Sequence, residues 1–275
     1  MALIDDLTAQ ARREKRLIDA ITEDFAEDLD RVVTQINRQI RRLLARLDNS
    51  DGKLIAERAS LGRALALRAE ITTAMDAAGF GDLVTRAFDL DDLAILTLKG
   101  NGIAARAARQ TPIDPNIVTA LQELREADLL AMGEQAADAF WRAALDGVIG
   151  SRDLADLVDD MADLADVTKR QARTLHDTAV STYSRQVRQL GLPGEPDDRF
   201  LYMGPFDGRT RPFCRNLIGE VHTREEISRM SNGQIAGVLL TGGGYNCRHT
   251  FQFIGSSTVE ELGGTSTPAQ QELGV

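Results

Sequence analysis

The sequence contains few cysteine, histidine and aromatic residues. There are 2 Cys and 3 His in 275 residues, and aromatic residues make up 5%. Two cysteines cannot form a disulfide scaffold, and this number is typical of a protein assembled in a reducing cytoplasm. The low aromatic content, together with abundant Ala and Leu, favours packed helices over a sheet sandwich.

Long apolar runs are also missing. No run approaches the roughly 20 residues that span a bilayer, and the first residues carry acids without the apolar core of a signal peptide. The net charge is −10, whereas a protein that coats nucleic acid is usually basic. We therefore expect a soluble protein with no membrane segment, in which any contact with nucleic acid is local.

The clearest pattern that is present lies near the N-terminus. Apolar residues recur from Ile18 to Leu47 at spacings of 3, 4, 4, 3, 4, 4, 3 and 4. This repeat of about 3.67 residues is closer to the period of a straight helix than to that of a left-handed coiled coil. It predicts a long, straight amphipathic helix over about residues 3–47, which ends at the turn-forming "DNSDG" of residues 48–52.

Basic residues gather in the second half of this predicted helix. They are Arg31, Arg38, Arg41, Arg42 and Arg46. One interpretation is a solvated face whose cations suit the C-terminal end of the helix dipole. The other is an arginine strip that binds nucleic acid or an acidic partner.

Further helices are predicted as far as residue 192. The patterns indicate helices over 53–78 and 82–99, a break at 111–116, and another long helix that carries Trp141 in its core face. Two more helices are expected after it, with Ser151 and Thr168 as N-caps. Their aspartates and arginines are interpreted as solvated faces, and His176 as a surface or capping residue.

The composition changes after residue 192. Strand-like segments are "RFLYMGPF" (199–206), "IAGVLLTGGGY" (235–245) and "CRHTFQFIG" (247–255), with a helix-like "TREEISRMSNG" (223–233) between them. The prediction is a mainly α protein: a helical body over 1–192, a compact, loop-rich α+β module over 193–257, and a polar tail over 258–275.

The module holds a candidate metal set. Cys214, His222, Cys247 and His249 are ligands of the kind that zinc prefers in tetrahedral sites, although paired C-x2-C motifs are absent. The alternative is two buried cysteines that act as small hydrophobic residues, with His249 hydrogen-bonded nearby. Sulfurs about 3.5–4 Å apart would fit zinc, and about 2.05 Å would mean a disulfide. A nucleophilic Cys247–His249 pair is a third alternative, which no recognisable oxyanion donor supports.

Two charged loops are expected to close on each other. Asp207, in "DGRTRPFC", can accept hydrogen bonds from Arg209, Arg211 or Arg248, and such guanidinium–carboxylate contacts would join loop to loop. The glycines of "TGGGYNCRH" predict a tight turn that brings Asn246 and the residues after it to this loop. The pairing predicts a structural latch.

The same two motifs resemble the phage head morphogenesis proteins, the minor capsid proteins typified by protein F of phage Mu. The resemblance covers about residues 168–253, including the helix-like segment 168–187. Several members close on "HPxCRC", where this chain has "YNCRH". The matching positions are Asp207, Arg209, Thr210, Arg211, Cys214, Cys247, Arg248 and His249.

The resemblance implies a non-enzymatic minor head protein of a tailed bacteriophage. Such a protein would associate with the portal protein inside the prohead, would meet major capsid or scaffolding protein and packaged DNA, and would be present in several copies around the portal ring. Its place would be the portal vertex of the virion, and the host cytoplasm during assembly. No cofactor is expected, zinc being the exception considered. Two alternatives remain: a metal-dependent, nuclease-like enzyme that uses the Cys/His set, and a DNA-binding accessory protein that uses the arginine strip.

Overall fold

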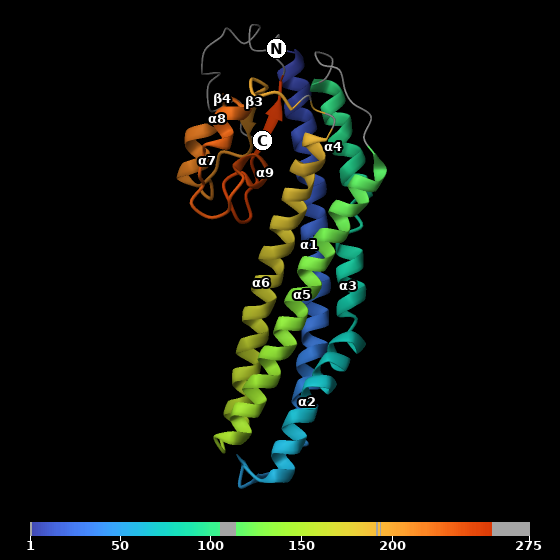
Figure 1. Cartoon of the computed structure of the whole chain (residues 1–275), viewed down its shortest axis with the longest axis vertical. Helices are drawn as coiled ribbons and strands as arrows, with labels where there is room; N and C mark the ends of the chain where they lie inside the picture. Colours follow the sequence, from blue (N-terminus) through green and yellow to red (C-terminus); the bar gives the residue numbers. More distant parts are fainter. Residues whose placement is uncertain (1, 105–113, 191, 193, 255–275) are drawn as a thin grey trace. The chain divides into compact units, whose positions relative to one another are not determined.

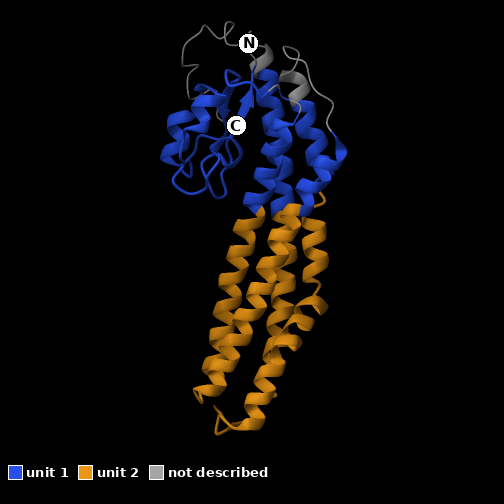
Figure 2. Cartoon of the chain, in the orientation of Figure 1, with its two compact units in different colours: residues 1–22, 90–123, 177–275 blue, residues 23–89, 124–176 orange. Residues whose placement is uncertain are grey.

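The computed structural model describes residues 2–104, 114–190, 192 and 194–254. The chain is mainly helical with a small C-terminal sheet, which confirms the predicted fold class (Figure 1). The described residues form two compact units (Figure 2). Unit 1 is drawn from residues 1–22, 90–123 and 177–275, and unit 2 from residues 23–89 and 124–176. The predicted polar tail over 258–275 lies outside the described residues.

Helix α1, Ala2–Leu44, is the predicted long amphipathic helix. Its apolar repeat is buried, since Phe25, Leu29, Ile36 and Ile40 are each at most 5% exposed. The helix ends at a hairpin of β1, Asn49–Ser50, and β2, Lys53–Leu54. Asp51 and Gly52 at its tip have φ of 52° and 82°, a left-handed pair that tight hairpin turns require.

The predicted helices that follow differ in their limits from those of the structure. Helix α2 covers Arg58–Ala77, α3 covers Phe80–Ala87 and α4 covers Asp91–Ala104. The segment predicted as one helix over 82–99 is therefore two, separated at residues 88–90. Helix α5, Pro115–Ile149, begins after Asp114, whose carboxylate accepts from the Asn116 N–H at 2.9 Å.

Within unit 2, α1, α2, α3, α5 and α6 pack side by side (Figure 2). Gly133 of α5 makes one close approach, because a Cβ there would lie 2.3 Å from Phe80 Cε1. The Trp141 indole is half-buried and donates to the carbonyl of Ala64 at 3.2 Å. Apolar packing and a small residue at the contact therefore hold these helices together.

Helix α6, Leu154–Gln189, corrects the prediction of two helices with caps at Ser151 and Thr168. Thr168 lies inside the helix, and its hydroxyl donates to the carbonyl of Leu164 at 2.8 Å, a bond that a helix interior permits. His176 is also not a surface residue. It is fully buried, stacks on Phe25 with ring centroids 3.9 Å apart, and its Nε2 lies 3.2 Å from the Ala87 carbonyl.

The sheet of unit 1 is antiparallel with the order β4-β3-β5. Strand β3, Arg199–Met203, is central, between β4, Val221–Thr223, and β5, Thr250–Phe253. Short helices connect the strands: α7, Pro212–Leu217, α8, Arg224–Ser228, and α9, Val238–Thr241. Phe200, Tyr202 and Phe251 are at the centre of a core that also includes Leu7 of α1.

The expected strand over 235–245 is wrong. This segment forms α9, between Gly237 and Gly242, whose φ values are 76° and 56°. Left-handed backbone at both ends turns the chain out of an extended path, so the apolar residues between them make one helical turn. Helix α8 starts as the sequence indicated, with a capping box between Thr223 and Glu226.

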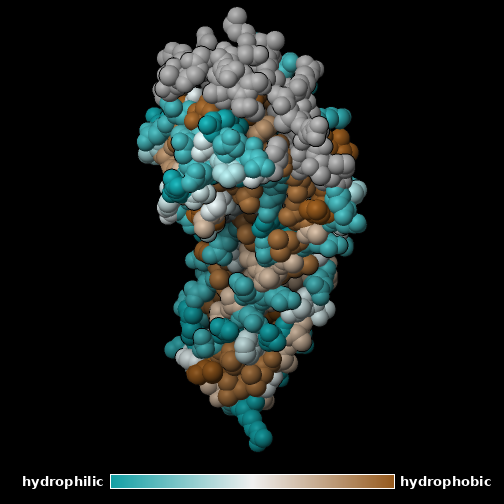
Figure 3. Space-filling model, turned by 45° about the horizontal axis from the view of Figure 1, so that its top comes forward, coloured by the Kyte–Doolittle hydropathy of each residue, from teal (hydrophilic) through white to brown (hydrophobic). Residues whose placement is uncertain are grey.

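Apolar residues also reach the surface of unit 2. Leu65, Leu130 and Ile149 are 57%, 39% and 59% exposed, and Figure 3 shows hydrophobic and hydrophilic residues side by side on one face. Among the described helices, none has the length and apolar character that crossing a membrane requires.

Candidate functional site

The two sequence motifs meet in unit 1 through a forked ion pair. Arg248 Nη1 and Nη2 donate to the two carboxylate oxygens of Asp207, each at 2.7 Å. Arg248 holds the pKa of Asp207 well below its usual range because the guanidinium stabilises the carboxylate. The pairing predicted between the two loops is therefore confirmed, with Arg248 as the partner.

The other motif residues reinforce this loop-to-loop contact, which we call the latch. Arg211 donates to the carbonyls of Gly243 and Tyr245 at 3.0 and 2.6 Å. The Thr210 hydroxyl, which is buried, donates to the Pro205 carbonyl at 2.9 Å. The expected guanidinium contact of Arg209 is replaced by a backbone contact, because its N–H donates to Asp207 Oδ1 at 2.9 Å.

Asn246 fixes the turn after the glycines. Its φ is 53°, which asparagine tolerates better than most residues. Its N–H donates to the Thr178 hydroxyl at 3.1 Å, and that hydroxyl lies 3.3 Å from Asn246 Oδ1. The turn is thus tied to α6.

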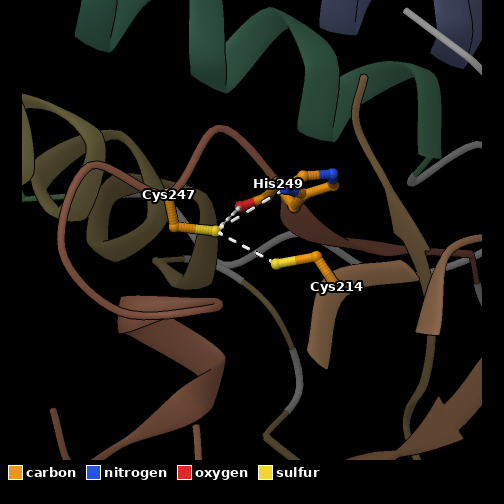
Figure 4. Close-up of side chains that lie close together, drawn as sticks. All are labelled: Cys214, Cys247 and His249. Carbon is orange, nitrogen blue, oxygen red and sulfur yellow. Dashed lines mark hydrogen bonds between the residues drawn. The ribbon is translucent and has the colours of Figure 1, made fainter. Parts of the chain in front are cut away.

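Beneath the latch, Cys214 of α7 meets Cys247 and His249, which lie in the loop before β5 (Figure 4). The two sulfurs are 3.9 Å apart, and Cys247 Sγ lies 3.7 Å from His249 Nδ1. All three residues are at most 4% exposed. The cysteines are free thiols. The separation of their sulfurs lies in the range expected for a zinc site and is longer than a disulfide bond.

His222, the fourth predicted ligand, lies elsewhere. It pairs with Phe200 across β4 and β3, and its ring meets the edge of Phe251 with centroids 6.4 Å apart. Burial lowers the pKa of His222. His222 is therefore a packing residue beside the α8 cap.

The orientation of His249 is fixed by its second nitrogen. Its Nε2 lies 2.8 Å from the carbonyl oxygen of Pro205, and since a carbonyl only accepts, Nε2 carries the proton. Nδ1 is the ring nitrogen that faces the Cys247 sulfur. Gly204 leaves room for the ring, because a Cβ there would lie 2.5 Å from His249 Cδ2.

The two thiols differ in their surroundings. The hydrogen bond from Cys214 lowers the pKa of Cys247, and the contacts with His249 and Arg185 act in the same direction. The same hydrogen bond between the two thiols, together with burial, raises the pKa of Cys214. Gly243 N–H donates to Cys247 Sγ at 3.0 Å. Cys247 is therefore the more acidic thiol of the pair and Cys214 the less acidic one.

Arg185 of α6 is the main residue that the sequence did not single out. It is 4% exposed, against the solvated face predicted for it. Its guanidinium donates to the carbonyls of Cys247, His249 and Leu240, the last two at 3.0 and 3.3 Å. Burial lowers its pKa, which the negative charge of Cys247 opposes. The buried arginine thus holds the backbone on both sides of Arg248.

A second buried arginine on α6 lies close by. Arg188 pairs with Glu14 of α1 and with the side chain of Gln252 on β5, and both ionised groups are at most 4% exposed on their side chains. A cavity of about 70 Å³ opens between these residues and the Cys247–His249 segment. The cavity is small, and its lining includes charges of both signs.

A signal for the missed residues exists in the sequence. Arg185 and Arg188 alternate with Val180, Tyr183 and Val187, which are fully buried, so the two arginines lie among apolar positions of one helix. Tyr202, whose hydroxyl lies 3.4 Å from Cys214 Sγ, occurs in a strand-like run, where it is indistinguishable from an ordinary core residue.

The arginine strip lies in unit 2, with four of its arginines on α1 and Arg46 just after the helix ends at Leu44. All five of its arginines are exposed, but Arg31 pairs with Asp28 and Arg46 with Glu70. Part of its positive charge is therefore neutralised by neighbouring acids, as in a solvated helix face.

Comparisons with family models, with curated proteins and with solved structures find no match for this chain. The site is a closed arrangement in which the Asp207–Arg248 ion pair and the buried Arg185 fix two loops around a thiol–imidazole cluster.

Proposed function

We propose that this protein is a non-enzymatic minor head protein of a tailed bacteriophage, which associates with the portal protein inside the prohead and assists head assembly and DNA packaging or delivery. The observation that carries the proposal is the latch. The residues on which the resemblance to the head morphogenesis proteins rests are not scattered over the surface, but close on one another through Asp207 and Arg248.

The chemistry of the site supports a structural role. Cys247 and His249 are 4% and 3% exposed, and a nucleophile must be reached by its substrate. His249 Nε2 is occupied by the Pro205 carbonyl, and the Gly243 N–H points at the Cys247 sulfur. These groups hold the loops together, where a catalytic site would direct them at a substrate.

The helical part of the chain supports the proposal that the portal protein is the binding partner. A helix of 43 residues and exposed side chains such as Leu65 and Ile149 offer an extended surface for lateral packing against partner helices. The net charge of −10 fits basic portal or capsid surfaces better than DNA. On this proposal several copies surround the portal ring, and the protein reaches the virion from the host cytoplasm.

The test is co-expression of the full chain with the portal protein encoded by the same phage. We expect a stable complex that co-purifies, with a mass that gives several copies per portal ring. The variant Asp207→Ala/Arg248→Ala should weaken capture of the complex, and the charge exchange Asp207→Arg/Arg248→Asp should restore part of it, because the pair is re-formed in reverse. A folded wild-type chain that does not associate with the portal would contradict the proposal.

A further inference from the structure

We propose that Cys214 Sγ, Cys247 Sγ and His249 Nδ1 form a structural binding site for one Zn²⁺ ion. The site goes beyond the proposed function and does not depend on it. Zinc is the ion of choice because thiolate and imidazole ligands in a buried, closed site select it over the oxygen-preferring cations.

The separations of the ligand atoms match a zinc tetrahedron. Bonds of about 2.3 Å to sulfur and about 2.05 Å to nitrogen place two sulfurs about 3.8 Å apart, and a sulfur and a nitrogen about 3.6 Å apart. The observed separations are 3.9 Å for Cys214–Cys247 and 3.7 Å for Cys247–His249. All three ligand atoms lie within 4.8 Å of one another. A small rotation of side chains is enough to bring them onto one ion.

The groups behind the ligands are those that metal sites use. A metal-bound histidine characteristically donates its other N–H to a carbonyl or carboxylate, and His249 Nε2 donates to Pro205 O. The Gly243 N–H donates to Cys247 Sγ. Gly243 itself cannot carry a side chain, since a Cβ would lie 2.3 Å from the Cys214 sulfur. The backbone thus approaches the sulfurs as closely as glycine allows.

The charge balance also favours a cation. Binding of Zn²⁺ releases the remaining thiol protons and leaves two thiolates, a neutral imidazole and the ion, a set with no net charge. Arg185 then faces the carbonyls of two ligands, Cys247 and His249, and positions the loop that carries them. The ligand loop is fixed before the ion arrives, because the latch and Arg185 hold it on both sides.

The fourth position of the tetrahedron adjoins Tyr202. Its hydroxyl lies 3.4 Å from Cys214 Sγ and 3.9 Å from Cys247 Sγ, whereas His222 is held on β4. The three-ligand set is thus completed by this hydroxyl or by a water, and Tyr202→Phe distinguishes the two.

The experiment uses the full chain, purified with a thiol reductant and no chelator. Elemental analysis should give one zinc per chain. Replacement by Co²⁺ should give the intense thiolate-to-cobalt absorption of a site with two sulfur ligands. Cys214→Ser, Cys247→Ser and His249→Ala should each weaken zinc binding at least a hundredfold in chelator competition. His222→Ala removes a half-buried histidine of the same module and should bind as the wild type does. Tyr202→Phe should keep the stoichiometry and change the cobalt spectrum only if the hydroxyl is a ligand.

The cobalt titration of the wild type needs no variant, so loss of folding cannot obscure the result. A folded wild-type chain that takes up neither ion overturns the proposal, as does an unchanged affinity in both cysteine variants. Cysteines found as a disulfide under the same reducing conditions overturn it too. Metal content is measured without the portal protein, so its failure is distinct from failure of the proposed function.

Discussion

Replacing Arg185 with methionine tests whether the buried guanidinium is what fixes the latch. Methionine is similar in length and lacks the donors, so the carbonyls of Cys247 and His249 lose their hydrogen bonds inside a buried site. The Leu240 carbonyl is partly exposed and can turn to water. The loss in the free energy of unfolding therefore comes mainly from the two buried carbonyl groups.

The magnitude follows from these two groups. A buried acceptor left without a donor costs about 1–3 kcal/mol, so two of them cost about 2–6 kcal/mol. Removing a buried cation relieves part of its own desolvation. We expect the free energy of unfolding to fall by about 3 kcal/mol, roughly a hundredfold in the unfolding equilibrium constant.

The chain contains suitable probes for the measurement. Its tyrosines, at positions 183, 202 and 245, all belong to unit 1, whereas Trp141 belongs to unit 2. Urea unfolding followed by the near-ultraviolet circular dichroism of tyrosine should show the loss, with tryptophan fluorescence recorded beside it. Arg173→Met is the matched control, because Arg173 is exposed on the same helix, and it should change stability by less than about 0.5 kcal/mol. A loss below about 1 kcal/mol in Arg185→Met would falsify the assigned role.

Three further outcomes follow from the module. Gly243→Ala should destabilise unit 1 by about 2 kcal/mol or more, since its methyl group would overlap a sulfur, while Gly208→Ala, which has open space around it, should be nearly neutral in urea unfolding. A double-mutant cycle on Asp207 and Arg248 should give a coupling of about 0.5–1 kcal/mol, because the side chains are 40% and 23% exposed; no coupling would contradict the latch. The folded-state pKa of His222 is lowered below its ordinary value of 6.5, so its contribution to stability is present above about pH 6.5 and is lost as pH falls through the folded pKa. His222→Gln should flatten that pH dependence, and an identical profile would contradict it.

Some of these features could be predicted from the sequence because they follow from local spacing. The apolar stripe from Ile18 to Leu47 repeats so regularly that its period alone predicts the helix. The charged residues of two turns predict that Asp207 pairs with an arginine. The limits of α6 could not be predicted in this way. Thr168 has the residue type of an N-cap, but tertiary packing carries the helix through it, and its hydroxyl bonds within the helix instead.

The site itself depends on contacts across the sequence that no local pattern encodes. His222 and His249 are equally plausible ligands by residue type and spacing, and the sheet register decides between them by turning His222 toward Phe251. Arg185 lies 62 residues before Cys247, in a helix where a solvated arginine is the usual expectation. Only the folded chain shows that its side chain points into the module.

Arg185 and Arg188 connect the C-terminal module to the helices of unit 1. The sequence separates a helical body from a C-terminal module at residue 192, yet unit 1 contains both the module and the helical residues 2–22 and 177–190. Leu7 of α1 is part of the module's core, Glu14 of α1 pairs with Arg188, and Arg185 holds the ligand loop. A short sheet of three strands buries little surface by itself, so the helices supply the apolar and charged contacts that it lacks. Any partner that moves the ends of α1 or α6 within unit 1 therefore acts on the same contacts that hold Cys247 and His249 in place. The latch and the helical residues of unit 1 are therefore parts of one connected set of contacts.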